Sequence, residues 1–288
     1  MFRGSVLCLY VLFQTVLSIQ FPPSNDTEGF RTLLREAKHL VVITGAGISR
    51  GVPAYSEAWG PWRNFYATDL DNDYTFENLP FLVWQFTHYR RESILKAGPN
   101  AAHKVLADYE EHLRTEGKGR NLTIITTNFD GLHIQAGSQN VIEVCGSLFK
   151  TRCLKCGKVL ENRNQPMWPS LAGKGDPNAH DYTQVEEDVL PHCECGGRLR
   201  PHILFQGESI SKQVIYQAED VLRVADLCMV IGSSGELAPV DEFAPTLAGR
   251  GVPVAELNLL NTDLTIYYQY QFKGDCVEIL PHIIQPLL

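Results

Sequence analysis

The sequence predicts an α/β fold in which a Rossmann-type parallel sheet carries two insertions, a small helical module and a zinc ribbon. Three observations support this prediction. Short apolar runs recur along the chain and end in small or polar residues, one of them ends in "TGAGIS", and four of the eight cysteines form two close pairs. Continuous apolar runs are typical of buried parallel strands, whose carboxyl ends hold ligands in open α/β sheets.

The predicted elements of the sheet follow one another between residues 40 and 257. A helix comes first, because apolar residues within 29–38 recur at helical spacing. The run "HLVVITGAGIS" then predicts the first strand and the turn that follows it. Further strands are expected at 122–126, 227–232 and 252–257, with helices at 100–114 and 210–224.

Two segments interrupt this pattern. Residues 55–99 are rich in aromatic side chains and predict a small helical module that covers the sheet edge. Residues 146–200 contain the cysteine pairs and a polar middle rich in proline and glycine, at 164–182, which predicts a zinc ribbon with a long exposed loop.

Residues 1–22 form an apolar leader. No charge occurs between residues 4 and 21, behind Arg3, which resembles a secretory signal; an atypical organellar presequence is the alternative. After Leu17 no segment has the length and apolarity of a membrane span, so we expect no stable membrane insertion beyond the leader.

The net charge of −8 argues against nucleic acid as a partner. Binding to a phosphate backbone needs clustered lysine and arginine, and only short basic pairs such as Arg90-Arg91 occur. The expected partners are a small molecule and a peptide.

The cysteine pairs predict one structural zinc. Cys153 and Cys156 have the spacing that lets two thiolates reach one tetrahedral metal, and Cys193 and Cys195 supply the second pair. The second spacing is one residue tighter than usual, so the adjoining His192 is an alternative ligand. Unliganded buried cysteines are the remaining alternative.

Two turns are candidates for ligand contacts. Backbone amides at Gly45 and Gly47 before a helix start would cradle a diphosphate, although the glycines equally suit a tight turn. Asn128 and Asp130 follow the second strand, where they could hold a ribose or a carboxamide. Asp130 is equally suited to cap the helix expected near Gly131.

Several segments together resemble the sirtuin family. "GAGIS", "PNAAH", "TNFDGLHIQAG", "GSLFKTRCLKCG", "RLRPHILFQGE", "GVPVAELN" and "FKGDC" occur in that family's order over residues 30 to 285. "SLFKTRC" and "HYRRE" are most similar to its sirtuin-five-type branch, mitochondrial lysine desuccinylases and demalonylases. The resemblance implies a catalytic domain at 28–285, NAD as cosubstrate, acylated lysine peptides or proteins as partners, and a mitochondrial location; the secretory pathway is the alternative that the leader suggests.

The resemblance also implies site residues. Asn128 and Cys145 fall at catalytic positions, Cys145 at that of the histidine that acts as general base. Thr87 and Arg90 match the pair that grips an acyl carboxylate, and Phe205 and Gln206 match a pair that clamps the lysine stem. The implied NAD contacts are Gly45, Ala46, Gly47, Ser49, Thr127, Asn128, Asp130, Gly232, Ser233, Ser234, Asn258, Leu259 and Cys276.

The chain departs from the family pattern at several of these positions. A thiol, with a pKa near 8.5, replaces the imidazole at Cys145, which predicts weak or absent turnover. Thr127 replaces a glutamine, Thr87 a tyrosine, and Ser56 an arginine that would meet NAD.

The sequence is therefore compatible with three functions. The first is an NAD-dependent protein-lysine deacylase for short acidic acyl groups. The second is an inactive sirtuin-like module that binds NAD, ADP-ribose or an acyl-lysine peptide. A Rossmann oxidoreductase is disfavoured, because no acidic residue stands about twenty residues after the glycines, where a ribose contact is expected.

Overall fold

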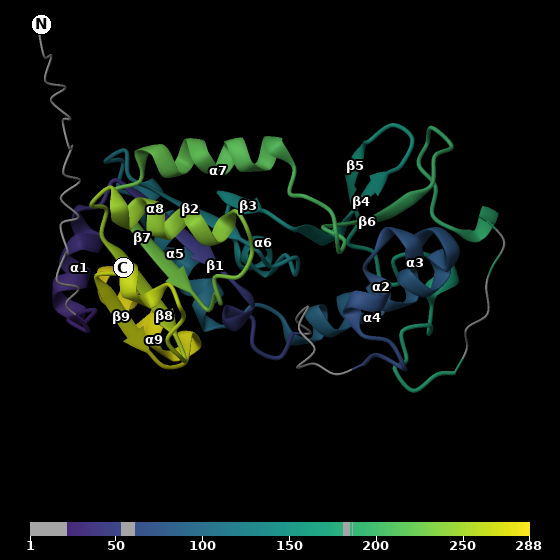
Figure 1. The fold of residues 1–288 in the computed structure, drawn as a ribbon, viewed down its shortest axis with the longest axis horizontal. Helices are drawn as coiled ribbons and strands as arrows, with labels where there is room; N and C mark the ends of the chain where they lie inside the picture. The colour runs from purple at the N-terminus through teal and green to yellow at the C-terminus, as the bar shows by residue number, and fades with distance from the viewer. Residues whose placement is uncertain (1–21, 53–60, 181–184, 186) are drawn as a thin grey trace, which may run out of the picture.

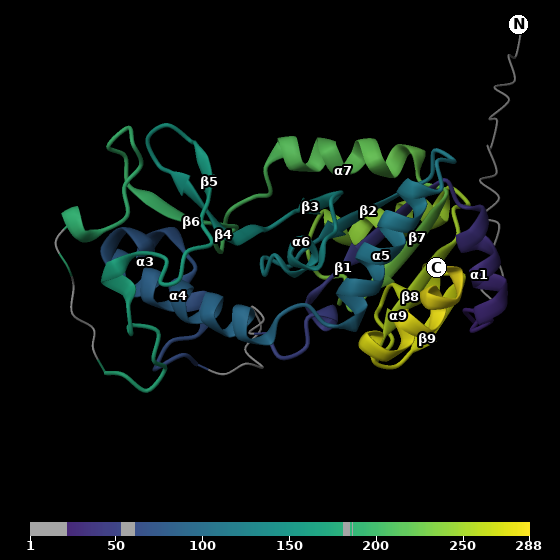
Figure 2. The same ribbon diagram turned by 180° about the vertical axis from the view of Figure 1, so that it is seen from behind.

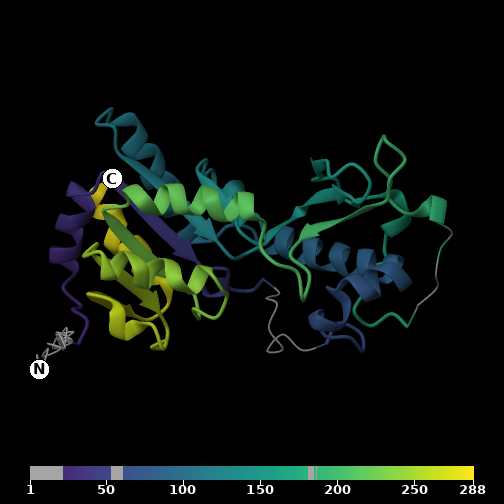
Figure 3. The same ribbon diagram turned by 45° about the horizontal axis from the view of Figure 1, so that its top comes forward.

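The computed structural model describes residues 22–52, 61–180, 185 and 187–288. In all three views the sheet and its helices lie at one end of the molecule, and the helical module and the ribbon lie at the other (Figures 1, 2 and 3). Residues 1–21 of the predicted leader (1–22) and the positions Tyr55 and Ser56 lie outside the described residues.

The strands are β1 (His39–Thr44), β2 (Asn121–Thr126), β3 (Val141–Glu143), β4 (Gly146–Cys153), β5 (Val159–Glu161), β6 (Leu199–Ile203), β7 (Leu227–Ile231), β8 (Val254–Asn258) and β9 (Tyr270–Lys273). The helices are α1 (Thr27–Glu36), α2 (Ala67–Leu70), α3 (Asp73–Asn78), α4 (Pro80–Ala97), α5 (Ala101–Thr115), α6 (Leu132–Ala136), α7 (Lys212–Val224), α8 (Phe243–Gly249) and α9 (Cys276–Ile284). Single 3-10 turns include η1 (Ala46–Ile48), η3 (Pro169–Leu171), η4 (Glu187–Val189), η5 (Val240–Glu242), η6 (Thr265–Tyr267) and η7 (Gln285–Leu287).

The larger sheet is parallel throughout and has the strand order β3-β2-β1-β7-β8-β9. The chain moves outward from β1 through β2 to β3 and then returns to the other side of β1 with β7. The carboxyl ends of β1 and β7 therefore form the point at which strand order reverses. Open α/β sheets bind their ligands in the crevice outside such a point.

Alternate side chains of β1 enter two different cores. Leu40 and Val42 pack with buried residues of α1, α5 and α9, whereas Val41 and Ile43 pack with those of α7 and α8. The helices accordingly cover both faces of the sheet: α7 and α8 lie over one face in Figure 1, and α1, α5 and α9 come to the front in Figure 2. The result is a three-layer sandwich in which the strands are buried on both sides.

The second part of the molecule has its own core. The ribbon sheet has the order β5-β4-β6 and is antiparallel. Aromatic side chains of the helical module, among them Phe76 and Trp84, pack with Phe149 of β4 and Phe205 beyond β6. The cluster also includes Cys153 and Cys193, so one apolar core joins the helical module to the cysteine pairs.

The structure bears out the predicted fold class and adds elements that the apolar pattern did not indicate. The four predicted strands correspond to β1, β2, β7 and β8, and the three predicted helices to α1, α5 and α7. β3, β9, α8 and α9 were not predicted. The helix start expected after the glycine turn is only the 3-10 turn η1.

Candidate functional site

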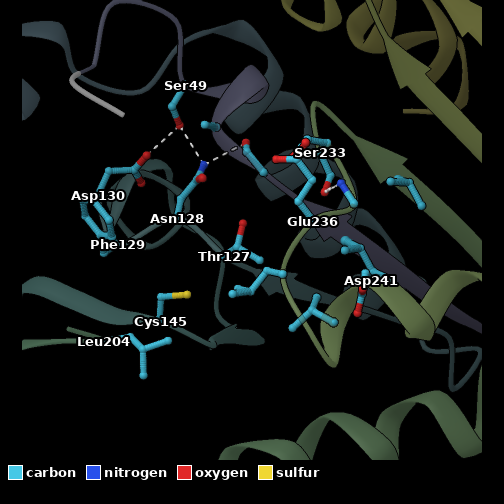
Figure 4. A pocket seen from close by; sticks show the side chains of 18 of the residues that line it. Ser49, Thr127, Asn128, Phe129, Asp130, Cys145, Leu204, Ser233, Glu236 and Asp241 are labelled. Atoms are coloured by element: carbon cyan, nitrogen blue, oxygen red, sulfur yellow. Dashed lines mark hydrogen bonds between the residues drawn. The ribbon is translucent and has the colours of Figure 1, made fainter. Parts of the chain in front are cut away.

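A cavity of about 550 Å³ lies at the point where strand order reverses. Its walls come from the turn after β1, the segment after β2, the segment after β7, and two pieces that flank the ribbon sheet. Figure 4 shows Ser49, Asn128 and Asp130 on one side, Cys145 and Leu204 on another, and Glu236 and Asp241 on a third. The cavity thus lies where both parts of the molecule meet.

Glycines at this edge allow two turns to touch. A Cβ at Gly45 would lie 2.7 Å from the Gly232 carbonyl oxygen, and one at Gly47 would lie 2.7 Å from Gly232 Cα. Gly232 has a φ of +58°, and its own Cβ would meet Ile48 N at 2.5 Å. Side chains are excluded at all three positions.

The amides of these glycines differ from our expectation. Gly45 N donates to Ile231 O at 3.1 Å, and Gly47 N donates to Gly232 O at 2.8 Å. Neither amide is a free donor for a diphosphate in this structure. The tight-turn alternative therefore describes their hydrogen bonding, while Gly45 and Ala46 still line the cavity.

A buried polar cluster connects the turns after β1 and β2. Ser49 Oγ donates to Asp130 Oδ2 at 2.6 Å, and Asn128 Nδ2 donates to Ser49 Oγ at 3.1 Å and to Gly45 O at 3.0 Å (Figure 4). Asp130 Oδ1 also accepts from Leu132 N, the first residue of α6, at 2.9 Å, but the N-cap residue of that helix is Gly131 and not Asp130 as the cap alternative expected. Asp130 lines the cavity, and burial raises the pKa of its carboxyl.

Two histidines support this cluster from behind and were not among the predicted site residues. His103 Nε2 lies 3.3 Å from Ser49 Oγ, and His133 Nε2 lies 3.0 Å from Thr44 Oγ1. Burial lowers the pKa of His103 to about 4, and burial with the neighbouring His103 lowers the pKa of His133 to about 3. Both rings are neutral at pH 7, and their place in "PNAAH" and "DGLH" was the signal that could have indicated them.

Cys145 lies between β3 and β4 and lines the cavity. Figure 4 shows its sulfur directed toward the cavity interior beside Leu204, whose amide donates to the Cys145 carbonyl at 2.9 Å. Burial raises the pKa of its thiol to about 11. Because the thiolate is the basic form, the side chain cannot accept a proton at neutral pH.

The four cysteines of the ribbon come together. Their sulfur atoms all lie within 4.8 Å of one another, with Cys153 3.5 Å from Cys195 and Cys156 3.9 Å from Cys193. A tetrahedral zinc with Zn–S bonds of about 2.3 Å places its sulfurs roughly 3.8 Å apart, so the cluster fits one zinc ion. Hydrogen bonds from the amides of Cys156 and Lys155 lower the pKa of Cys153 to about 6.

The histidine alternative does not fit this cluster. His192 is not among the grouped side chains, and its Nδ1 lies 2.8 Å from the Leu190 carbonyl oxygen. The four thiols already fill a tetrahedral shell, so the position is of the closed, structural kind.

Comparisons with known proteins bear on the family. A family model described as "Sir2 family" matches residues 45–239, more than half of the chain. The chain belongs to the Sir2 family. Sirtuin-5 of Canis lupus familiaris, named a mitochondrial NAD-dependent protein deacylase, is 44% identical over 271 residues, which are 92% of this chain and 86% of that protein. A Daphnia pulex NAD-dependent protein deacylase is 43% identical over 270 residues, 92% of this chain and 98% of that protein.

Solved sirtuin structures agree with the fold. A Sir2 homologue in complex with NAD superposes with a TM-score of 0.76 at 29% identity, covering 93% of this chain and 96% of that one. A Sir2 complex with a p53 peptide and NAD⁺ gives a TM-score of 0.69 at 27% identity, covering 90% of this chain and 98% of that one.

The cavity of this sirtuin brings together most of the predicted NAD and catalytic positions but not all of them. The predicted residues that line the cavity are Gly45, Ala46, Ser49, Thr127, Asn128, Asp130, Cys145, Phe205, Gln206, Ser233 and Ser234. Glu236 and Asp241 also line it and were not predicted. The predicted residues away from the wall are Gly47, Thr87, Arg90, Gly232, Asn258, Leu259 and Cys276.

Some of the residues off the wall support it. Asn258 Nδ2 donates to Ser233 O at 2.9 Å, and the buried Cys276 thiol donates to Gly47 O at 3.1 Å. Leu259 is exposed. The first two contacts therefore hold the turns after β1 and β7 in position.

Arg90 differs most from expectation. The resemblance led us to expect that it faces an acyl carboxylate. In the structure its side chain is 2% exposed, and it forms two hydrogen bonds to Asp71, which is fully buried. Burial raises the pKa of the Asp71 carboxyl, and the neighbouring Arg90 opposes that shift.

Proposed function

We propose that the cavity binds NAD and that the chain removes acyl groups from lysine side chains of peptides or proteins; its relatives are named NAD-dependent protein deacylases. The observation that carries this proposal is the buried contact of Ser49, Asn128 and Asp130 at the edge where strand order reverses. These side chains present a hydroxyl, an amide and a carboxylate, which suit the ribose and the carboxamide of NAD.

Different walls of the cavity would bind different ligands. Residues after β1, β2 and β7 would hold the dinucleotide. Phe205 and Gln206, which lie beyond β6, would contact the lysine stem from the other side. The reaction needs both ligands close together, and the cavity is the place where the sheet and the ribbon come into contact.

Cys145 limits the reaction. In sirtuins a general base deprotonates the ribose hydroxyls after nicotinamide has left, and a base typically contributes about 10²–10⁴-fold to a rate. Because the pKa of the Cys145 thiol is about 11, this position supplies no base near neutral pH. A second candidate function follows from the same observation: a module that binds NAD, ADP-ribose or an acyl-lysine peptide and turns over slowly or not at all.

The location proposed for this chain is the mitochondrion, the compartment named for its vertebrate relatives. None of the described helices is long and apolar enough to span a membrane.

Nicotinamide release from NAD separates the two functions. Wild-type protein and Cys145→His are compared with peptides that carry acetyl-, butyryl- or succinyl-lysine, while NAD affinity is measured by calorimetry. We expect similar NAD affinities and a nicotinamide release rate over many turnovers that is about 10²–10⁴-fold higher in Cys145→His, because without the base the steps after the first release stall. Cys228→Ala, which changes a thiol buried in β7, is the matched control and should retain the wild-type rate.

The outcomes are distinct. A silent wild type beside an active histidine variant supports the binding module. Wild-type turnover as fast as that of Cys145→His would contradict the argument about the base. Failure of both proteins to bind NAD would overturn the proposed function.

A further inference from the structure

The guanidinium of Arg90 is already occupied by a carboxylate of this chain. Nη1 donates to Asp71 Oδ2 at 2.6 Å, and Nη2 donates to Asp71 Oδ1 at 2.8 Å. The two nitrogens and the two oxygens form the paired contact that a guanidinium makes with any carboxylate. Asp71 follows α2 directly, so the backbone of the helical module fixes its position.

This ion pair lies immediately behind the cavity wall. The Arg90 guanidinium lies 4.1 Å from the ring centre of Phe86 and 5.3 Å from that of Phe129, and Phe129 lines the cavity. The backbone N–H of Gln206, a residue that also lines the cavity, donates a hydrogen bond to the backbone carbonyl of Asp71 at 2.7 Å. Phe129 and Gln206 therefore contact both the cavity and the ion pair.

The polar atoms left beside the pair suit an uncharged group. Arg90 Nε and Thr87 Oγ1 are buried and have no hydrogen-bond partner among the described residues. They lie one turn apart on α4, and each can serve a neutral carbonyl or hydroxyl. A second carboxylate would have to share Arg90 with Asp71, and two buried carboxylates side by side repel each other.

We propose that Asp71 takes the place on Arg90 that an acyl carboxylate would occupy, so that this sirtuin accepts lysines carrying an uncharged acyl group. This inference rests on the proposed function and names its substrate class. Asp71 is then the residue that determines acyl preference, and Arg90 forms a structural ion pair with it. The preference for acidic acyl groups expected from the resemblance is reversed.

Peptide binding tests the preference without requiring turnover. Fluorescence polarisation is measured with labelled acetyl-, butyryl- and succinyl-lysine peptides in the presence of ADP-ribose. Wild-type protein should bind the butyryl peptide at least about tenfold more tightly than the succinyl peptide. Asp71→Ala and Asp71→Asn should gain roughly 10- to 100-fold in succinyl affinity, because a freed Arg90 forms charged hydrogen bonds with the ligand.

Control variants separate local chemistry from net charge. Glu77→Gln removes one negative charge from an exposed position of α3 and should keep the wild-type order of affinities. Asp71→Ala combined with Arg90→Leu removes both charges and should bind the succinyl peptide no better than wild type does. A succinyl preference in wild type, or no succinyl gain in folded Asp71→Ala, would overturn the inference.

A second measurement does not depend on any peptide. Asp71→Ala leaves a buried guanidinium without its partner, so formate or acetate should raise its thermal midpoint relative to chloride at equal ionic strength. Wild type should show no such rise. If no acyl peptide binds any variant but formate rescues Asp71→Ala, the proposed function fails and the assignment of Arg90 stands. Absence of rescue in a folded variant would overturn that assignment.

Discussion

The two sides of the cavity differ in how well they suit the reaction of this family. The sheet side presents Ser49, Asn128 and Asp130 in mutual contact, with neutral histidines behind them. The opposite side presents a neutral thiol at Cys145, and Arg90, which lies behind its wall, is already paired with Asp71. In the proposed function, binding of the dinucleotide and chemistry on the acyl group therefore rest on different parts of the fold, and one can change while the other stays.

Removal of zinc should produce the largest difference in stability between the sheet side and the ribbon side of the cavity. A structural zinc contributes on the order of 10 kcal/mol to the folding of a small domain. We expect chelation to unfold the ribbon, seen as lost amide protection in β4–β6, while β1, β2 and β7 keep theirs in hydrogen exchange.

Cysteine variants control that experiment. Cys156→Ser should lower the bound zinc measured by elemental analysis, whereas Cys228→Ala, in the sheet, should keep one zinc per chain. A metal-free protein with unchanged protection would rule out a zinc that stabilises the ribbon.

Glycine substitutions in the ribbon should have the next largest effect. Gly146, beside Cys145, has a φ of +77°, and a Cβ there would lie 2.0 Å from His202 O. We expect Gly146→Ala to lower the free energy of unfolding by about 2–5 kcal/mol, because strain and a backbone clash add. Gly157, near the cysteines, has a φ of +72° and nothing within 4 Å, so Gly157→Ala should cost only about 1–2 kcal/mol.

Urea denaturation measures both variants. Equal losses at the two positions would show that the backbone around His202 relaxes to admit a methyl group.

Acid should weaken the sheet side gradually as the pH falls. In the unfolded chain histidine titrates near pH 6.5, whereas the folded pKa values of His103 and His133 are about 4 and about 3. The unfolded state therefore binds more protons below pH 6.5, so stability is complete above that pH and falls as the pH is lowered toward 4. The expected slope is about 1.4 kcal/mol per pH unit for each histidine.

Urea denaturation between pH 7 and pH 4.5 measures this slope. His133→Gln should reduce it, and His180→Gln, which changes an exposed histidine, should retain it. A slope that is unaffected by His133→Gln would mean that other groups govern the loss of stability.

The sequence predicted the strands of the sheet and the cysteine cluster better than it predicted the smaller elements, for physical reasons. β1, β2, β7 and β8 are short, mostly apolar runs that are largely buried, and their pattern predicted them directly. β3 has only three residues, all half-buried, which are too few to show a period. The buried residues of α9 recur at helical spacing, but the proline inside it is unfavourable in a helix, so the sequence alone did not indicate one there. The cysteine cluster was predictable because its spacing reflects the geometry of the metal.

The pairing of Arg90 was not predictable in the same way. Asp71 lies 19 positions from Arg90 and belongs to no recognisable spacing, so only the folded helical module brings the two together. The raised pKa of Cys145 likewise depends on burial, which the letter in the sequence does not show. The motifs predicted many of the residues that line the cavity. Packing then determined whether each side chain is charged and whether it is free to contact a ligand.

The contact between the glycine turns limits how this cavity can be redesigned. Since Gly45, Gly47 and Gly232 each exclude a methyl group that the others would meet, no one of them can be exchanged on its own. In a mutational library aimed at new ligands, most substitutions at these three positions would give misfolded or destabilised proteins. The productive positions are Leu204, Gln206 and Glu236, whose side chains face the cavity from outside that locked pair of turns.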